Sequence, residues 1–430
     1  MAGTQRNIAV LGGSYGGISA AHNILKHTLP HLPEKETYQV VLISPASQVM
    51  CRPGCPRALI SDDLLDQSRF FVDIATQFEQ YPKGSFRFIQ GTATELDHQS
   101  RTVTYSSAAR GGGEDSKPER ISFYALVIAT GASTPSPLFS FGPDEKALRA
   151  SWARFRRALP AARSIVVAGG GPTGVEVAGE LGEYLNGRAG YFRSKLASPK
   201  VAITVVTSGP RILPGVLRDS LAEKAEGLLA RVGVTVIKNT RVASVAPEGA
   251  GTDSEKTKLD GDVLATKTTV TLENGETLEA DIYIPAVGMK YNTGFVAQSL
   301  LAADGRIDTN ASTLRVDKAG PRVYAVGDVS SAARPAVHSI LGQIPVLSAN
   351  LKRDLLIEAG VQDGKTAGED RVFKEDTSET QLVPIGQSKG VGAFSGWAVP
   401  SFFVWLIKGR DYWLWTTGNL WSGKQWIKEG

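Results

Sequence analysis

The strongest constraint on the fold is a glycine-rich turn that occurs twice, each time between an apolar run and a helix-like segment. The copies lie in residues 8–25 and 164–185. In each, four apolar residues precede the glycines, as in a buried parallel strand, and the residues after them have helical periodicity. Strand, tight turn and helix in this order open a Rossmann unit. The sequence therefore predicts an α/β fold with two such units, continued by strands at 39–43 and 202–206.

The first turn, GGSYGG, matches G-x-G-x-x-G except that Ser14 stands at the middle glycine. Glycines there allow a tight turn, close approach of the backbone to a pyrophosphate, and close packing of helix on strand. The pyrophosphate then binds free amides at the helix N-terminus. A turn without a ligand is the alternative for this copy. The residues predicted to contact a dinucleotide here are Gly12, Gly13, Ser14, Tyr15, Gly16 and Gly17.

The second turn, GGGPTG, fits the fingerprint fully and begins 157 residues after the first. Two such turns, each between strand and helix, are far more specific than one. They indicate one site for FAD and one for NAD(P)H, and a duplicated scaffold with one inactive site is the alternative. The residues predicted to contact NAD(P)H are Gly169, Gly171, Pro172, Thr173, Gly174 and Glu176.

A third signal lies late in the chain, where the apolar run 323–326 ends in Gly-Asp. It resembles the second FAD motif of flavoproteins with two dinucleotide-binding domains, which implies that the aspartate binds the ribitol side of FAD. Residues 126–131 resemble the linker motif of those proteins, and residues 285–288 resemble its counterpart on the return to the FAD domain. These motifs add the following candidates: Ala129, Thr130, Gly131, Gly288, Gly327 and Asp328.

With these motifs in this order, the chain resembles apoptosis-inducing-factor-like, mitochondrion-associated oxidoreductases of the fungal kind. That family is related to the ferroptosis-suppressor quinone reductases and, more distantly, to type II NADH dehydrogenases. The resemblance covers essentially the whole sequence, and the tail segments 386–392 and 406–411 separate the chain from the wider pyridine-nucleotide reductases. It implies hydride transfer from NADH or NADPH to FAD, and then electron transfer to a small organic acceptor, with a quinone expected.

The resemblance also carries individual residues. It implies that Arg57 contacts FAD and that the backbone near Ala93 faces the adenine. Ser44 replaces the carboxylate that commonly holds the FAD ribose, and it can still form a hydrogen bond. At the matching point of the second unit, residues 207–211 contain no acid either. Arg211 there slightly favours NADPH over NADH, unless it only faces solvent.

Two further groups have open roles. Cys51 and Cys55 lie where disulfide reductases of this superfamily place a redox pair, but the spacing differs and Pro53-Gly54 favours a turn. Two buried bystander thiols are the alternative. His338 is a candidate to protonate the reduced acceptor or to bind the flavin, and a structural histidine is the alternative. The five histidines have no ligand-like spacing, so no metal site is expected.

Composition excludes other classes of protein. The chain has 47 basic and 43 acidic residues without a run of five or more like charges, so nucleic-acid binding is not indicated. Two cysteines in 430 residues and no signal-like or membrane-spanning apolar run favour a cytoplasmic location. Two polar inserts, 110–119 and 247–258, are predicted loops.

The expected domains follow from the motif order. An FAD-binding domain of residues 1–135 and 284–352 is interrupted by an NAD(P)H-binding domain of residues 155–283, and a small α+β region of residues 370–430 follows. The oligomeric state is not predicted. The acceptor is left as a quinone or, if the chain is a tailoring enzyme, a polycyclic aromatic metabolite. A flavin monooxygenase and a non-enzymatic redox-signalling or DNA-binding protein are weaker alternatives.

The C-terminal region is rich in aromatic residues, since six of the seven tryptophans lie between residues 397 and 426. Interleaved with Lys and Arg, they suit peripheral contact with a membrane surface, such as the mitochondrial outer membrane or a lipid droplet. Such a surface would give access to lipid-soluble quinones. The alternative is that the rings pack against the protein core or a second subunit.

Overall fold

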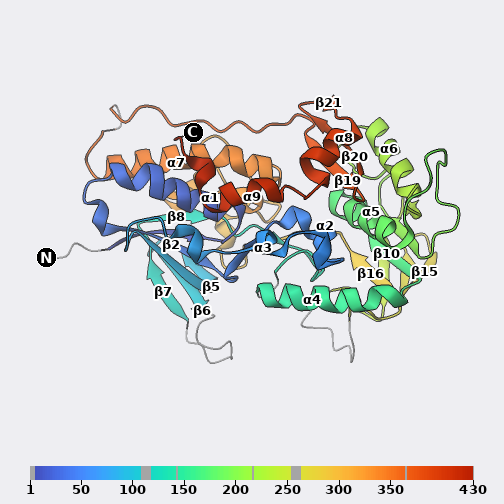
Figure 1. Ribbon diagram of the computed structural model, residues 1–430. Helices are drawn as coiled ribbons and strands as arrows, with labels where there is room; N and C mark the ends of the chain where they lie inside the picture. The colour runs from blue at the N-terminus through green and yellow to red at the C-terminus, as the bar shows by residue number, and fades with distance from the viewer. Residues whose placement is uncertain are drawn as a thin grey trace.

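Two mainly parallel sheets form the framework of the protein, of which we describe a computed structural model. The structure describes residues 5–107, 118–141, 144–215, 217–252, 263–363 and 366–429. One sheet has seven strands and the other four, and they lie side by side in Figure 1. The predicted α/β class with two Rossmann-like units is confirmed. Most of the loop predicted at 110–119, and part of that at 247–258, lies outside the described residues.

The seven-stranded sheet has the order β18-β8-β1-β2-β5-β6-β7. Its first five strands are parallel, and β6 and β7 extend it antiparallel. Because β18 joins β8 only after the chain has built the other sheet, this unit is discontinuous in sequence. The strands are β1 (Arg6–Leu11), β2 (Tyr38–Ser44), β5 (Phe86–Asp97), β6 (Thr102–Ser107), β7 (Glu119–Ser122), β8 (Ala125–Ile128) and β18 (Val323–Ala325).

Two helices cover one face of this sheet, namely α1 (Tyr15–Asn23), continued by a π-helical turn (Ile24–Thr28), and α7 (Val337–Glu358). Apolar side chains alternate along the strands, so Ile8 and Val10 join the core under the helices, whereas Ala9 and Leu11 join the core on the other face. We call this sheet with α1 and α7 the first module.

The four-stranded sheet is fully parallel, in the order β12-β11-β10-β16. Helices α5 (Pro172–Asn186) and α6 (Asp219–Ala230) accompany it, and a three-stranded antiparallel sheet packs against apolar residues of its other face. We call this unit the second module. Its strands are β10 (Ser164–Ala168), β11 (Ala202–Val206), β12 (Val234–Ile237) and β16 (Ile282–Pro285), and those of the small sheet are β13 (Val242–Ala246), β14 (Thr268–Leu272) and β15 (Thr277–Ala280).

The two connections between the modules run side by side, because β9 (Ala132–Ser133) pairs antiparallel with β17 (Lys290–Tyr291). A long helix, α4 (Glu145–Ala158), follows the first connection. The segment after β2 also reaches toward the second module. It forms β3 (Gln48–Met50), a 3-10 turn (Arg52–Gly54), α2 (Cys55–Ala58), α3 (Gln67–Phe70) and β4 (Phe71–Asp73).

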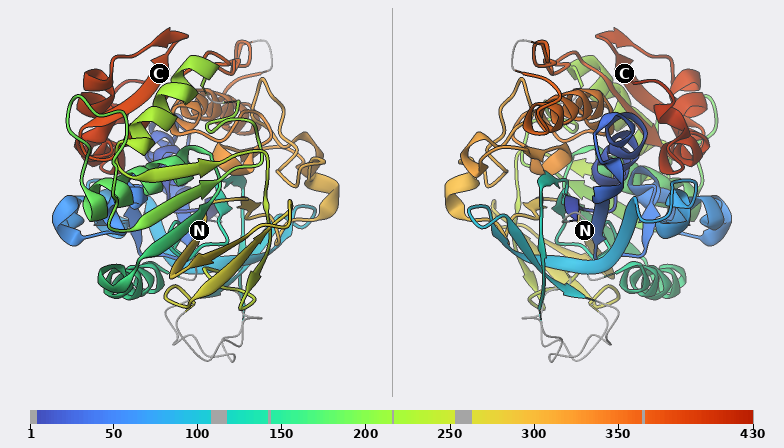
Figure 2. Two further views of the ribbon diagram at one scale, coloured as in Figure 1. Left: turned by 90° about the vertical axis from the view of Figure 1, so that its right-hand side faces the viewer. Right: turned by 90° about the vertical axis from the view of Figure 1, so that its left-hand side faces the viewer.

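The C-terminal region lies across both modules (Figure 1). Its three-stranded sheet packs on α5 and α6, whereas α9 contacts α1. Figure 2 shows in two side views that these red segments stay on one side of the molecule. Across the described ranges, no helix has both the length and the apolarity to cross a bilayer. The elements are β19 (Gln381–Ile385), β20 (Lys389–Phe394), β21 (Trp397–Ala398), α8 (Ser401–Val404), a π-helical turn (Trp405–Gly409) and α9 (Leu414–Trp421).

The aromatic rings of this region divide into two groups. Trp421 and Trp426 are buried in the core of the first module. Trp397 and Trp415 are 80% and 52% exposed. Packing against the core therefore accounts for part of the aromatic cluster and leaves the other part on the surface.

Candidate functional site

The two glycine turns have the same local geometry. Gly12 has φ +113° and Gly169 has φ +125°, a backbone conformation that favours glycine. A Cβ on Gly12 would lie 2.2 Å from the carbonyl oxygen of Ala129, and one on Gly169 would lie 2.4 Å from that of Ala286. Each turn therefore needs glycine to pass so close to the neighbouring strand.

The remaining glycines of the turns also correspond. A Cβ on Gly17 would lie 1.7 Å from the Gly12 carbonyl oxygen, and one on Gly174 would lie 2.0 Å from the Gly169 carbonyl oxygen. These contacts let each helix begin directly over its turn. Its first amides are then free for an anion, as pyrophosphate binding requires.

A hydroxyl group lies beneath each turn at the end of the second strand. Ser44 Oγ would be 2.6 Å from a Cβ on Gly13, and Thr207 Oγ1 would be 2.5 Å from a Cβ on Gly170. Both hydroxyl residues are 4% exposed. Ser44, the predicted substitute for the ribose-binding carboxylate, therefore lies close under the turn.

The middle position of the turn tolerates a side chain. Ser14 is exposed, and a Cβ at the corresponding Gly171 would meet no atom within 4 Å. The serine in the first turn thus leaves the cradle intact. Tyr15, Gly16, Pro172 and Thr173 lie in the first turns of α1 and α5, next to the amides that would bind phosphate.

The Gly-Asp motif forms a short 3-10 turn at the end of β18. Gly327 has φ +79°, and its N–H donates to Gln343 Oε1 at 2.8 Å. Burial raises the pKa of Asp328, and the charge of Arg52 partly opposes this rise. The side chain of Asp328 has no hydrogen bond to another described residue, so its carboxylate fits the hydroxyl groups of a ribitol chain.

The linker residues lie at the matching points of both modules. Gly131 and Gly288 have φ +64° and +72°, and a Cβ on either would meet no described atom within 4 Å. Ala129 is buried behind the first turn, and Thr130 donates its hydroxyl to the carbonyl of Asn292 at 2.8 Å. Ala93 is half-buried at a bulge in β5, away from these turns in the sequence. The turns, Ser44, Asp328 and the linkers together fit FAD and a nicotinamide dinucleotide.

The structure corrects the role expected of Arg57. All parts of its guanidinium are engaged within the protein: Nε and Nη2 donate to Glu180 at 3.0 and 2.7 Å, and Nη1 and Nη2 donate to main-chain carbonyls. The side chain is 4% exposed. Arg57 is therefore a buried interdomain residue with no N–H left for a cofactor.

Arg52 is the arginine that this segment offers to a ligand instead. It is half-buried, donates to the carbonyl of Ala132 at 2.7 Å, and is close enough to lower the pKa of Asp328. No sequence motif had pointed to Arg52. Two arginines follow β2 within a few residues, and only their burial and partners distinguish the one that faces the linker and Asp328.

Glu176 also has a partner that the sequence did not indicate. Its carboxylate binds Lys408 Nζ at 2.5 Å, and both side chains are about 95% buried. Burial raises the pKa of Glu176 to about 7, although Lys408 lowers it. Glu176 therefore links the start of α5 to the C-terminal region and does not face the turn as the motif implied.

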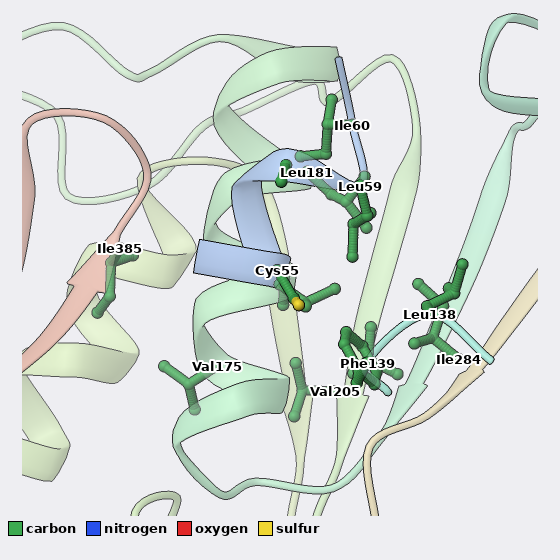
Figure 3. Packing of buried hydrophobic residues seen from close by; sticks show 14 of the residues in the cluster. Cys55, Leu59, Ile60, Leu138, Phe139, Val175, Leu181, Val205, Ile284 and Ile385 are labelled. Atoms are coloured by element: carbon green, nitrogen blue, oxygen red, sulfur yellow. The ribbon is translucent and has the colours of Figure 1, made fainter. Parts of the chain in front are cut away.

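The two cysteines are buried and unpaired. Cys51 Sγ donates to the carbonyl of Tyr412 at 3.2 Å, and Figure 3 shows the Cys55 sulfur among apolar side chains, with Val175 and Leu181 of α5 nearby. Burial raises the thiol pKa of Cys51 to about 11 and that of Cys55 to about 12. Thiols that stay protonated are poor nucleophiles, so the geometry favours the bystander alternative.

His338 lies in the first turn of α7, the helix that contacts the Gly-Asp turn. It is half-buried, and its Nε2 atom is buried without a partner among the described residues. Burial, followed by the charge of Arg334, lowers its pKa. A neutral imidazole can accept or donate one hydrogen bond here.

At the ribose end of the second site, Arg211 is ion-paired with Asp219, the first residue of α6. Asp219 partly neutralises the charge that would favour NADPH, while residues 207–211, directly after β11, contain no carboxylate to select NADH. Within the described ranges no group of three or more His, Cys, Asp or Glu side chains is arranged to hold a metal.

The paired turns, the Gly-Asp motif and the side-by-side linkers define a flavoprotein that binds two dinucleotides. The family model of pyridine nucleotide-disulphide oxidoreductases matches residues 6–346. The chain belongs to this family, and it is an oxidoreductase that uses FAD and NAD(P)H.

Curated relatives extend along the chain. It is 59% identical over 425 residues to the oxidoreductase phnG of Penicillium herquei, covering 99% of this chain and 98% of that protein. It is 30% identical to the oxidoreductase ptaL of Pestalotiopsis fici, covering 94% and 95%. It is 24% identical over 409 residues to human ferroptosis suppressor protein 1, covering 94% and 93%.

Solved structures share the fold at lower identity. The NDH2 of Plasmodium falciparum in complex with NADH has a TM-score of 0.63 at 14% identity, and 99% of each chain is covered. The NAD-dependent persulfide reductase of A. fulgidus has a TM-score of 0.62 at 19% identity, covering 90% of this chain and 64% of that one.

Proposed function

We propose that this enzyme passes electrons from NADH or NADPH, by way of FAD, to a small planar organic acceptor, in the first instance a quinone. The observation that carries the proposal is the pair of equivalent glycine turns joined by side-by-side linkers, which suits two nucleotides that meet end to end. The resemblance to ferroptosis suppressor protein 1 along nearly the whole chain supports membership in the apoptosis-inducing-factor-like group.

In this proposal the chain binds and orients its cofactors. The free amides of α1 and α5 hold the two pyrophosphates, and Asp328 accepts hydrogen bonds from the ribitol hydroxyls. Bound FAD supplies the hydride and electron chemistry. Glu176, buried at the start of α5 against Lys408, has a pKa raised by burial to about 7, so its carboxyl group can hold or release a proton near neutral pH.

A second candidate acceptor is a polycyclic aromatic metabolite. The fungal relatives are more similar to this chain, at 59% and 30% identity, than ferroptosis suppressor protein 1 is at 24%. An acceptor particular to the fungal proteins would share the cofactor sites and differ only in the pocket that receives it.

Anaerobic stopped-flow experiments test both acceptors. The yellow holoenzyme should bleach when mixed with NADH or NADPH, and should regain its absorbance on a second mixing with a quinone. Reoxidation by a polycyclic aromatic acceptor, but not by simple quinones, would favour the second candidate. A flavin that neither nicotinamide reduces would contradict the proposal.

We further propose that the enzyme contacts a membrane surface through exposed aromatic side chains of the C-terminal region. Phe402 and Phe403 form an edge-to-face pair and are 60% and 48% exposed, and Trp415 donates to the carbonyl of Ile407 beside them. Apolar groups on the outer face of a helix, with exposed Arg410 nearby, suit the headgroup boundary of an anionic bilayer.

Vesicle flotation tests this contact. The holoenzyme should float with vesicles of phosphatidylcholine and phosphatidylserine, and the double variant Phe402→Ser with Phe403→Ser should bind them about tenfold less. The matched control changes Tyr191 and Phe192 to Ser, an aromatic pair 86% and 96% exposed in the second module. Equal loss in both variants, or none in either, would refute the assignment of this surface.

A further inference from the structure

Three side chains from three parts of the chain meet in the buried space between α2, α5 and the C-terminal region. Arg57 and Glu180 form two hydrogen bonds, at 3.0 and 2.7 Å, with side-chain exposures of 4% and 1%. Tyr412, fully buried, donates its hydroxyl to Glu180 Oε1 at 3.0 Å. Arg57 also donates to the carbonyls of Gly409 and Arg410 at 2.6 and 3.1 Å. We call Arg57, Glu180 and Tyr412 the interdomain triad.

The contacts of the triad continue to the first module. The carbonyl of Tyr412 accepts a hydrogen bond from Cys51 Sγ at 3.2 Å, and Cys51 Sγ accepts one from Tyr15 at 3.6 Å. Tyr15 begins α1 directly after the first glycine turn, and Glu180 lies on α5 after the second. A chain of polar contacts therefore joins the two nucleotide-binding helices through the C-terminal region.

The backbone at Tyr412 is strained. Tyr412 and Trp413 have φ +52° and +69°, left-handed conformations that cost on the order of 1 to 3 kcal/mol for large residues. Such a conformation persists only where the surroundings hold it. Here the N–H, the carbonyl and the hydroxyl of Tyr412 are all hydrogen-bonded to buried groups.

Stability alone gives little reason for this arrangement. Replacing a buried ion pair by apolar side chains of similar volume is often neutral or stabilising. The triad instead fixes three segments at defined hydrogen-bonding distances. One turn earlier on the same face of α5, Glu176 binds Lys408, so α5 and the C-terminal region share a second buried contact besides that of Glu180 with Tyr412.

We propose that Arg57, Glu180 and Tyr412 are positioning residues that hold α1 and α5 in the relative placement that hydride transfer requires. This inference rests on the proposed function. None of the three needs to touch a cofactor, because a displacement of about 1 Å between reacting groups can cost about a hundredfold in rate.

The chain contains a matched control for the test. Tyr324 is also fully buried and donates to Asp354 Oδ2 at 2.6 Å, and Asp354 pairs with Arg315 at 2.7 Å. This second tyrosine–carboxylate–arginine group lies where β18 meets α7, within the first module. Tyr412→Phe and Tyr324→Phe therefore delete the same chemical group from similar surroundings, and only the first joins the modules.

Both variants are measured as holoenzymes for flavin content, melting temperature, limiting rate of flavin reduction by NADH and NADPH, and long-wavelength charge-transfer absorbance of the nicotinamide–flavin complex. We expect similar losses of melting temperature and full flavin content in both. Only Tyr412→Phe should slow flavin reduction, by about tenfold, and weaken the charge-transfer band, with little change in KM.

Equal reduction rates and bands in the two variants would overturn the inference, as would purification of Tyr412→Phe without flavin, since the role would then be structural. Failure of the unmodified holoenzyme to be reduced by either nicotinamide would refute the proposed function itself, and the positioning role with it. The two failures are thus distinguished by the unmodified enzyme alone.

Discussion

The nucleotide-binding helices α1 and α5 can be compared position by position, because matching residues lie 157 apart. The positions that shape the turns are the same or nearly so, whereas several positions further along the two helices differ. Ser19 corresponds to Glu176, His22 to Gly179 and Asn23 to Glu180. The matching pairs are Gly12 and Gly169, Gly13 and Gly170, Gly17 and Gly174, Ala129 and Ala286, and Gly131 and Gly288.

The differences show how one C-terminal region docks on two similar helices. On α1, the ring of His22 binds the carbonyl of Trp421 at 2.7 Å. At the same position of α5, Gly179 lets strand β19 approach so closely that a Cβ would lie 3.0 Å from the Ile385 Cα. The turns thus repeat the geometry that pyrophosphate binding requires, whereas docking of the C-terminal region uses a hydrogen bond on one helix and close packing and buried charges on the other.

Matched glycine substitutions should separate the two sites most strongly. In Gly17→Ala the new methyl group would collide with the Gly12 carbonyl, so FAD should be lost almost completely. In Gly174→Ala the collision is with the Gly169 carbonyl, so the yellow colour should remain while nicotinamide affinity falls by roughly a hundredfold or more. Flavin absorbance per protein and rapid-reaction titration measure these effects. Loss of flavin in both variants would mean that the turns are not functionally separate.

The second-largest difference is expected between the buried charge of Glu176 on α5 and the matching residue Ser19 on α1. Glu176→Gln leaves the Lys408 ammonium buried without a counter-charge, which should cost about 3 to 5 kcal/mol of unfolding free energy. Ser19→Ala, at the matching position of α1, removes a buried hydroxyl that has no partner in the described structure and should change stability by less than about 0.5 kcal/mol. Urea unfolding at equal flavin content tests the pair, and similar costs would show that charge pairing does not distinguish the helices.

His22 should make the docking on α1 sensitive to acid. Its Nδ1 accepts from the Tyr81 hydroxyl at 2.8 Å and its Nε2 donates to Trp421, a tautomer inferred from these partners. Burial lowers its pKa from 6.5 to about 4. Between these values the unfolded chain binds a proton that the folded protein does not. Stability should therefore fall by about 2 kcal/mol from pH 7 to pH 5.

Tryptophan fluorescence during urea unfolding at the two pH values measures this loss. His22→Gln, which cannot titrate, should be less stable at pH 7 but should lose less stability on acidification. The same pH dependence in His22→Gln and the unmodified enzyme would assign the acid sensitivity to another group.

The smallest effect is expected at the middle position of the turns, where Ser14 and Gly171 differ without a steric conflict. A side chain at Gly171 would enter open space, and this residue is the N-cap of α5, where serine is slightly preferred to glycine. Gly171→Ser should raise stability by a few tenths of a kcal/mol, and Ser14→Gly should lower it by a similar amount. Calorimetry checks the direction, and a large loss in either variant would show that the middle positions are not equivalent.

Much of the fold followed from local sequence. The strands expected at 39–43 and 202–206 are β2 (Tyr38–Ser44) and β11 (Ala202–Val206), and the helices begin at the glycine turns as the fingerprint predicts. The structure also agrees with a serine at the middle position of the first turn. The space around this position is open, so whether a side chain fits there does not depend on residues distant in the sequence. The end of α1 was less predictable, since it passes into a π-helical turn (Ile24–Thr28) that packs against α7.

The candidate site was predicted less completely, because the partners of its charged residues lie far away in the sequence. Two arginines follow β2, and no local pattern tells which is buried. Arg57 is hydrogen-bonded to Glu180, 123 residues away, and Glu176 is hydrogen-bonded to Lys408, 232 residues away. Such partners are decided by how α2, α5 and the C-terminal region pack together.

The sequence by itself determined the two glycine turns and the linkers that match them, because a turn that excludes a Cβ is specified by a few adjacent residues. Only the tertiary structure decided which charged side chains face the candidate site and which join the modules. A buried charge needs a partner, and its energy depends on groups brought close by folding and not by sequence.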